Sequence, residues 1–198
     1  MNLTKIYHKT RTLIIMPGSS WPVIASENSY RRKIISELLF PMAALVGLSS
    51  FLGTFISDGI EDSVTIGYLV FNGFISFLIF FLEVYLSAWL ITEIAISLKS
   101  DANSHSIFNL VIYSHIPFSL TLSFSLLFPQ LLFINLLGIY SFILFWKGIE
   151  HFTNMIEERK IIFMVISSVI MILLYTLLTI VFNNVYDTVI NQFNTFVP

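Results

Sequence analysis

Cysteine is absent from this 198-residue sequence, and charged side chains make up only 11% of it. Without cysteine the chain has no disulfide, no thiol nucleophile and no thiolate metal ligand. A net charge of −2 offers no excess of positive charge to bind nucleic acid. A soluble domain carries roughly 25% charged residues, so this chain has too few to cover a water-soluble fold. These shortages indicate a membrane protein.

Recognisable catalytic motifs are missing as well. The sequence contains no phosphate-binding loop, no GxSxG elbow and no HExxH pair. We therefore expect no enzyme activity, no cofactor and no metal site. Glu150, His151, Glu157 and Glu158 are the residues closest to a cation-binding set, but they fall in a connector of mixed charge. A solvated surface explains them better.

Apolar residues make up 56% of the chain, and they gather into runs long enough to cross a bilayer. Crossing roughly 30 Å of hydrocarbon takes about 20 helical residues. Five runs qualify, near residues 34–56, 64–98, 107–127, 130–149 and 161–182. The fold class predicted is all-α, a polytopic membrane protein with a bundle of five transmembrane helices.

The flanks and connections complete the predicted organisation. Residues 1–33 form a cytoplasmic or interfacial segment, 34–182 the transmembrane domain, and 183–198 a short non-cytoplasmic tail. The second run contains no turn residues, so we interpret it as one long helix that is tilted or protrudes. Only Phe128 and Pro129 separate the third and fourth runs, which predicts antiparallel neighbours joined by a tight turn.

Positive charge sets the predicted orientation, because cytoplasmic flanks carry the excess of lysine and arginine. With five spans and the N-terminus inside, all ten basic residues lie on one side of the membrane. The other side receives Asp58, Glu61, Asp62 and Asp187. This segregation predicts a multi-pass protein of the cell inner membrane, with its N-terminus in and its C-terminus out.

Candidate contacts with lipid headgroups lie just before the first span. Trp21 suits the headgroup belt, and Arg31, Arg32 and Lys33 would attract anionic lipid at the cytoplasmic face. Ordinary topology-setting charge is the competing interpretation of the three basic residues. Glu37, one turn into the first span, is expected to touch them at the interface.

The third span contains polar residues in an otherwise apolar run, Tyr113, Ser114, His115 and Pro117. Pro117 cannot donate a backbone hydrogen bond to the carbonyl of Tyr113, so a kink is predicted there. Ser114, His115 or a neighbouring helix would then satisfy the freed carbonyl, which is a structural explanation. A functional interpretation remains open beside it, because an ionisable group inside a membrane is costly unless it is paired.

A polar stripe on the second span offers partners. At 100° per residue one face about 120° wide holds six polar residues: Asn72, Ser76, Glu83, Ser87, Glu93 and Ser97. If residues 74–96 cross the membrane, Glu83 reaches the midplane and can pair with His115, whereas a crossing by residues 64–84 prevents the pairing. The candidate intramembrane polar site therefore consists of Glu83, Ser87, Tyr113, Ser114, His115 and Pro117.

Small residues recur four apart in the first span, as Ala43 with Gly47 and Ser49 with Gly53. Such pairs let another helix approach closely. We expect them to serve helix packing within the chain, and a seam between two copies is the alternative.

Two motifs give the chain a family resemblance. In LIIMPGSSWPVIASE, Pro17, Trp21, Ile24 and Glu27 have a spacing common in bacterial members of the Yip1 domain family. In VIYSHIPFSL, Tyr113, Ser114 and Pro117 match that family's Y-S-x-x-P, and Gly138 and Gly148 also fit. The chain resembles this family over about residues 10–182, except that SDANSHS stands where many members have glycines.

The resemblance implies a five-span integral membrane protein without catalysis. On this basis we expect a protein that binds or organises membrane lipid or protein components. The alternative is a small ion channel or proton-linked transporter that uses Glu83 and His115. The lipid bilayer is the expected partner, and a protein partner or a second copy of the chain is left open.

Overall fold

The computed structural model describes the backbone of residues 3–27, 29–58, 66–100 and 103–196. Side chains are described within these ranges from residue 8 to residue 185, apart from Asp58. Glu61, Asp62 and part of the SDANSHS segment lie outside the described residues, as do the side chains of Asp58 and Asp187. Throughout the described ranges the regular structure is helical, which confirms the predicted all-α class.

Five helical segments in this part of the chain are long and apolar enough to span a membrane, which confirms the predicted number. They are Arg31–Ser57, Ile66–Ser97, Ser104–Leu127, Pro129–Phe152 and Glu157–Val185. The second is the single long helix α5 (Ile66–Ser97), as its lack of turn residues predicts.

The first span begins irregularly, in a way that hydropathy does not predict. It consists of α3 (Arg31–Ile34), a π-helical segment η1 (Ile35–Leu39) and α4 (Phe40–Asp58). Pro41 lies two residues after the end of η1 and has no N–H to donate to the turn before it. A wider turn at this place is one way in which a helix accommodates the missing bond.

The third span is broken at His115, which confirms the predicted kink. It consists of α6 (Ser104–Ser114) and α7 (Ile116–Leu127), with Pro117 in the first turn of α7. The predicted repair of the Tyr113 carbonyl by side chains is wrong. Ser114 Oγ donates to the carbonyl of Leu110 at 2.8 Å, and His115 Nδ1 lies 2.8 Å from the carbonyl oxygen of Val111. The carbonyls that they contact belong to residues three and two positions before Tyr113.

The fourth span starts as a 3-10 helix, η2 (Pro129–Ile139), and continues as α8 (Tyr140–Phe152). Only Phe128 lies between α7 and η2, and the two segments pack together, which confirms the tight turn. The fifth span belongs to α9 (Glu157–Phe196), which is longer than the predicted run. Residues 183–196, predicted as a tail, continue this helix.

The bundle is held together by close contacts of small residues. A Cβ atom added at Gly47 would lie 2.8 Å from the carbonyl oxygen of Gly73, so α4 and α5 touch through their backbones. At Gly53 the added atom would lie 1.8 Å from the carbonyl oxygen of Leu126 on α7. The small residues of the first span therefore serve packing within the chain, as expected.

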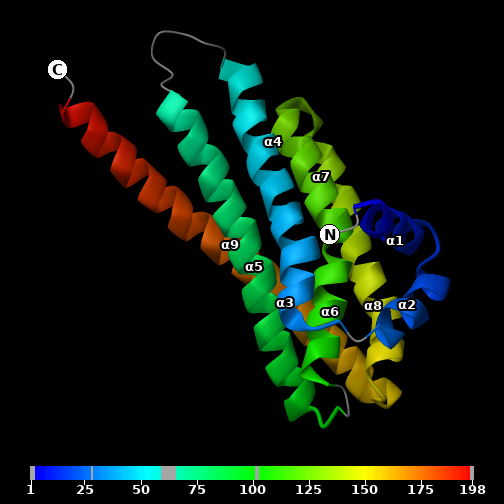
Figure 1. Ribbon diagram of the computed structural model, residues 1–198. Coiled ribbons are helices and arrows are strands. Elements are labelled where there is room, and N and C mark those ends of the chain that lie inside the picture. Colours follow the sequence, from blue (N-terminus) through cyan, green and yellow to red (C-terminus); the bar gives the residue numbers. More distant parts are fainter. Residues whose placement is uncertain (1–2, 28, 59–65, 101–102, 197–198) are drawn as a thin grey trace.

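Helix α9 lies along one side of the bundle and crosses it obliquely (Figure 1). It packs mainly on α5, and its C-terminal end lies apart from the ends of α4 and α7. Only 17% of its most apolar stretch is buried inside the protein. The fifth span is thus the least buried of the five.

Two N-terminal helices, α1 (Leu3–Ile15) and α2 (Pro17–Ser26), pack against the flank of the bundle beside α8. Leu13 and Trp21 are fully buried. The hydroxyl of Tyr140, halfway along the fourth span, donates to the carbonyl of Ile14 at 2.9 Å. The N-terminal segment therefore packs on the flank of the membrane domain.

Candidate functional site

Glu83 and His115 meet at the centre of the bundle. Glu83 lies about midway along α5, and His115 lies at the break between α6 and α7. His115 Nε2 is 3.2 Å from Glu83 Oε1, and the two side chains are 5% and 1% exposed. The pairing that the sequence leaves conditional on the depth of the second span is therefore present in the structure.

The hydrogen bonds around His115 define where a proton can be. A backbone carbonyl only accepts, so the contact with Val111 requires a hydrogen on His115 Nδ1. The contact between Nε2 and Glu83 Oε1 then holds one proton, carried either by an imidazolium or by a carboxylic acid. In both forms the pair has no net charge, which lowers the cost of burying it in the membrane.

Ser87 completes the pair on the same helix face. Its hydroxyl donates to Glu83 Oε1 at 3.1 Å, so that oxygen receives two contacts. The other carboxyl oxygen, Oε2, is buried without a hydrogen-bond partner. An unpartnered buried oxygen of a carboxyl group is costly, which marks this atom as the chemically open position of the site.

Glu83, whose Oε2 has no partner, lines a cavity of about 180 Å³. The cavity lies between α5, the break of the third span, the fourth span and α9, and it is lined by Phe118, Asn135, Ser141, Met171 and Tyr175 among others. Asn135 Oδ1 is likewise buried without a partner. Asn135 and Tyr175 were not among the predicted site residues, because nothing in their sequence surroundings relates them to Glu83.

A second and larger space opens at the predicted outer side of the membrane. This space, called the outer groove here, has a volume of about 460 Å³ and runs between α4, α5, α7 and α9. Hydroxyl and amide side chains line much of it, among them Ser50, Thr54, Ser57, Tyr68, Asn72, Ser76, Ser125, Thr179 and Asn183. No acidic or basic side chain is among its described lining residues. The groove is therefore polar and neutral.

Tyr175 lines both the outer groove and the central cavity. Its ring packs edge to face on Phe118 with centroids 5.3 Å apart, and Phe118 stacks on Phe80 at 6.2 Å. These three aromatic rings stand between the two spaces.

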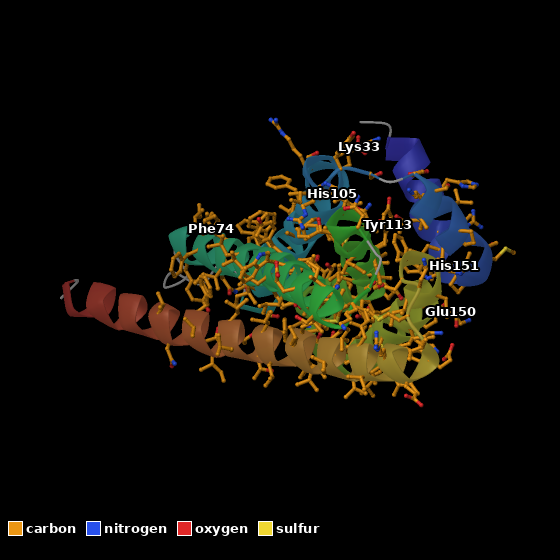
Figure 2. The ribbon with its side chains drawn as sticks, turned by 90° about the horizontal axis from the view of Figure 1, so that it is seen from below. Lys33, Phe74, His105, Tyr113, Glu150 and His151 are labelled. Atoms are coloured by element: carbon orange, nitrogen blue, oxygen red, sulfur yellow. The ribbon has the colours of Figure 1, made fainter. Side chains whose placement is uncertain are left out.

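Three of the residues that carry the family resemblance, Trp21, Tyr113 and Gly148, lie together. Trp21 packs edge to face on Tyr113, at 6.5 Å between centroids, and on Phe152 at 5.6 Å. A Cβ atom at Gly148 would lie 2.9 Å from the Trp21 ring. Figure 2 shows Tyr113 between α6 and the N-terminal helices. The prediction that Trp21 contacts lipid headgroups is wrong, because its ring is 0% exposed and fills this contact.

Lys9 holds the same junction by charge. It forms an ion pair with Glu27 and lies 4.8 Å above the ring of Tyr113. Burial lowers the pKa of Lys9, but the hydrogen bonds to Glu27 and Tyr113 outweigh it, so that the pKa is raised above 10.5. Lys9 is thus positively charged at neutral pH and joins α1 to α2 and α6.

The basic residues before the first span differ in exposure. Arg32 and Lys33 are exposed, whereas Arg31 is half-buried with its guanidinium 5.0 Å above the ring of Phe108. Glu37, Lys33 and Lys9 line one small pocket of about 70 Å³. At the far end of the fourth span Lys160 is buried and pairs with Glu150 and Glu157, so this connector holds an ion-pair cluster.

Among the described residues no three histidine, aspartate or glutamate side chains converge as a metal site. The fold and the site together define an all-α membrane protein with five spans, a packed N-terminal hairpin and a paired histidine and glutamate at its centre. The chain belongs to the Yip1 domain family, whose profile matches residues 11–180. No curated protein and no solved structure matches the chain significantly.

Proposed function

We propose that this Yip1-domain protein has no catalytic activity and binds a membrane lipid, whose polar headgroup occupies the outer groove. The observation that carries the proposal is the lining of that groove. Hydroxyls and amides at the depth of lipid chains are poorly matched by hydrocarbon, because each polar group left unpaired there costs free energy. A headgroup that enters beside α9 would pair with them.

The neutral lining favours an uncharged headgroup rich in hydroxyls. Among the described lining residues there is no arginine or lysine to pair with a phosphate. Asn72 Nδ2 already donates to Thr54 Oγ1 at 2.7 Å, and Ser76 Oγ to Ser50 Oγ at 2.8 Å. These pairs tie α4 to α5 and leave hydroxyl lone pairs for the hydroxyl groups of a glycerol or sugar.

The test uses the protein in nanodiscs that contain a glycosyl diacylglycerol, with native mass spectrometry as the measurement. Ser57→Leu with Asn183→Leu fills the exposed end of the groove with apolar side chains. Each substitution removes one hydrogen bond to the headgroup. The loss of both bonds should reduce lipid retention by about tenfold. Val181→Leu, on the exposed face of α9 outside the groove, is the matched control and retains the lipid. Equal retention by wild type and double variant would remove the proposal.

A second candidate function is proton-linked transport, favoured by the contact between Glu83 and His115. A buried pair that shares one proton is a common element of such transporters. Proteoliposomes decide between the two functions. If transport is the function, a flux of ions or protons is present in the wild type and absent in both Glu83→Gln and His115→Ala. A wild type without flux leaves lipid binding as the function.

A further inference from the structure

We infer that the central cavity is a binding site for a small primary amine, which reaches it from the hydrocarbon as the uncharged free base. The observations are the cavity beside Glu83, the two unpartnered acceptor atoms in it, and the single proton shared by Glu83 and His115. This site is separate from the outer groove and does not depend on the lipid proposed to bind there.

The open polar atoms of the cavity are both acceptors. Glu83 Oε2 and Asn135 Oδ1 have lone pairs and no donor, and both residues line the same space. The hydroxyl of Ser141 already accepts from the backbone N–H of Phe118 at 3.0 Å. A ligand that satisfies both open atoms must therefore present at least two N–H or O–H donors.

The rest of the wall is apolar and aromatic. Phe118, Phe142 and Tyr175 contribute rings, and Ile139, Met171 and Ile172 contribute aliphatic surface. A hard metal cation takes six or more oxygen ligands and does not fit two oxygens in an apolar wall. An ammonium group with an apolar body does, because the group pairs with the oxygens and lies against aromatic faces.

Size and position limit the ligand further. A cavity of roughly 150 Å³ accepts benzene, so a cavity of about 180 Å³ accommodates about eight non-hydrogen atoms. Ile139 and Ile172, which line the cavity between the fourth span and α9, are 57% and 56% exposed. The cavity therefore opens sideways towards the lipid chains. A membrane-permeant amine reaches it without passing through the loops.

The proton of the pair balances the charge. The incoming free base has a lone pair, and its nitrogen takes the proton that Glu83 and His115 share. One N–H bond forms on the ligand while the bond from this proton to His115 Nε2 or Glu83 Oε1 breaks. The product is an ammonium beside the Glu83 carboxylate and a neutral His115, so the cavity has no net charge before or after binding.

The experiment is isothermal titration of the full chain in nanodiscs at about pH 9, where free base is present, with empty nanodiscs as the baseline. The probes are benzylamine, benzyl alcohol and benzyltrimethylammonium. We expect benzylamine to bind at least tenfold more tightly than the alcohol, which offers one donor and does not take the proton. The quaternary ion has no N–H and adds a charge, so it should show no saturable binding.

Variants assign the binding to this cavity. Glu83→Gln should weaken benzylamine binding by ten- to a hundredfold, and Asn135→Leu by three- to tenfold while the contact of Glu83 with His115 remains. Asn183→Leu in the outer groove is the control and should leave the affinity unchanged. If Glu83→Gln does not fold, Asn135→Leu decides. Equal binding of amine and alcohol, unchanged affinity in Asn135→Leu, or no binding to folded wild type would each overturn the inference.

Discussion

At the scale of single residues, the pairing of Glu83 with His115 explains how two ionisable side chains are tolerated at the centre of an apolar bundle. Each would cost several kcal/mol alone in hydrocarbon. Together with Ser87 they share one proton and have no net charge, whichever residue holds that proton. The contacts among Glu83, His115 and Ser87, and not the surrounding hydrocarbon, therefore stabilise the pair.

A double-mutant cycle measures that stabilisation. Glu83→Gln and His115→Gln should each destabilise the protein, because each leaves a polar partner buried without its charge-assisted bond. The double variant should lose less than the sum, with a coupling free energy of about 1 to 2 kcal/mol, near the upper end for bonds inside membranes. Unfolding in mixed micelles gives the four stabilities. Strict additivity would show that the two side chains do not interact.

Lys9 gives a residue-scale prediction with a defined pH dependence. Its pKa is raised in the folded protein, so its stabilising contribution is complete below the ordinary value of 10.5 and is lost as the pH rises through the folded value. Limited proteolysis should find the N-terminal helices protected at neutral pH in the wild type and more readily cleaved in Lys9→Met. Above the folded pKa the wild type should become as sensitive as the variant, and an unchanged difference there would contradict this assignment.

Sequence alone relates these residues only in part. The 100° periodicity places Glu83 and Ser87 on one face, and the position of His115 in its span places it near the midplane. Periodicity does not fix the depth of a 32-residue helix, so the pairing stays conditional until the packing of α4, α6 and α9 on α5 is known. Asn135 and Tyr175 join the site only through tertiary packing, and no local pattern marks them.

At the scale of elements, the arrangement of the helices depends on close backbone contacts between them more than on side-chain volume. Hydropathy predicts all five spans, and Pro117 predicts the break in the third. Hydropathy predicts neither the π-helical start of the first span nor the 3-10 start of the fourth. Both depend on how backbone groups without a partner in a regular helix are accommodated, which hydropathy does not describe. The sequence also does not predict the burial of Trp21, because an aromatic ring suits a contact inside the protein as well as a membrane interface.

Gly53 tests the contact between the first and third spans. A Cβ atom there would overlap the carbonyl of Leu126, which is backbone and cannot rotate away. We expect Gly53→Ala to destabilise the bundle by about 2 kcal/mol or more, in the range of overpacked cores. Gly18→Ala is the matched control, since nothing lies within 4 Å of its added atom, and it should be neutral. Heat-induced aggregation of the purified variants measures both, and similar midpoints would refute the close approach.

At the scale of the whole molecule, we propose that the five spans place the two ends of the chain on opposite sides of a membrane. The described basic residues then lie with the N-terminal end, and Arg32 and Lys33 project there from the bundle. We propose that this face is cytoplasmic and in contact with anionic lipid. Each exposed basic residue contributes about 1 kcal/mol near such a surface.

Replacing Arg31, Arg32 and Lys33 with glutamine should therefore reduce the preference of the protein for anionic over zwitterionic lipid. Fluorescence quenching by brominated lipids in mixed vesicles is a suitable measurement, with the exposed Trp89 and the half-buried Trp146 as built-in probes. Arg32 and Lys33 should account for most of the loss, because Arg31 already lies against Phe108. An unchanged lipid preference, with the fold intact, would limit these residues to setting topology.

The orientation itself is tested by reporters that are active on only one side of the membrane. Fused to the N-terminus, a cytoplasmic reporter should be active and a periplasmic one inactive, and the reverse should hold at the C-terminus. The physical reason is that membrane proteins retain the lysine and arginine residues beside their spans on the cytoplasmic side. Arg31, Arg32 and Lys33 therefore oppose the inverted orientation. Because the number of spans is odd, both ends reporting from one side would require a span to be gained or lost.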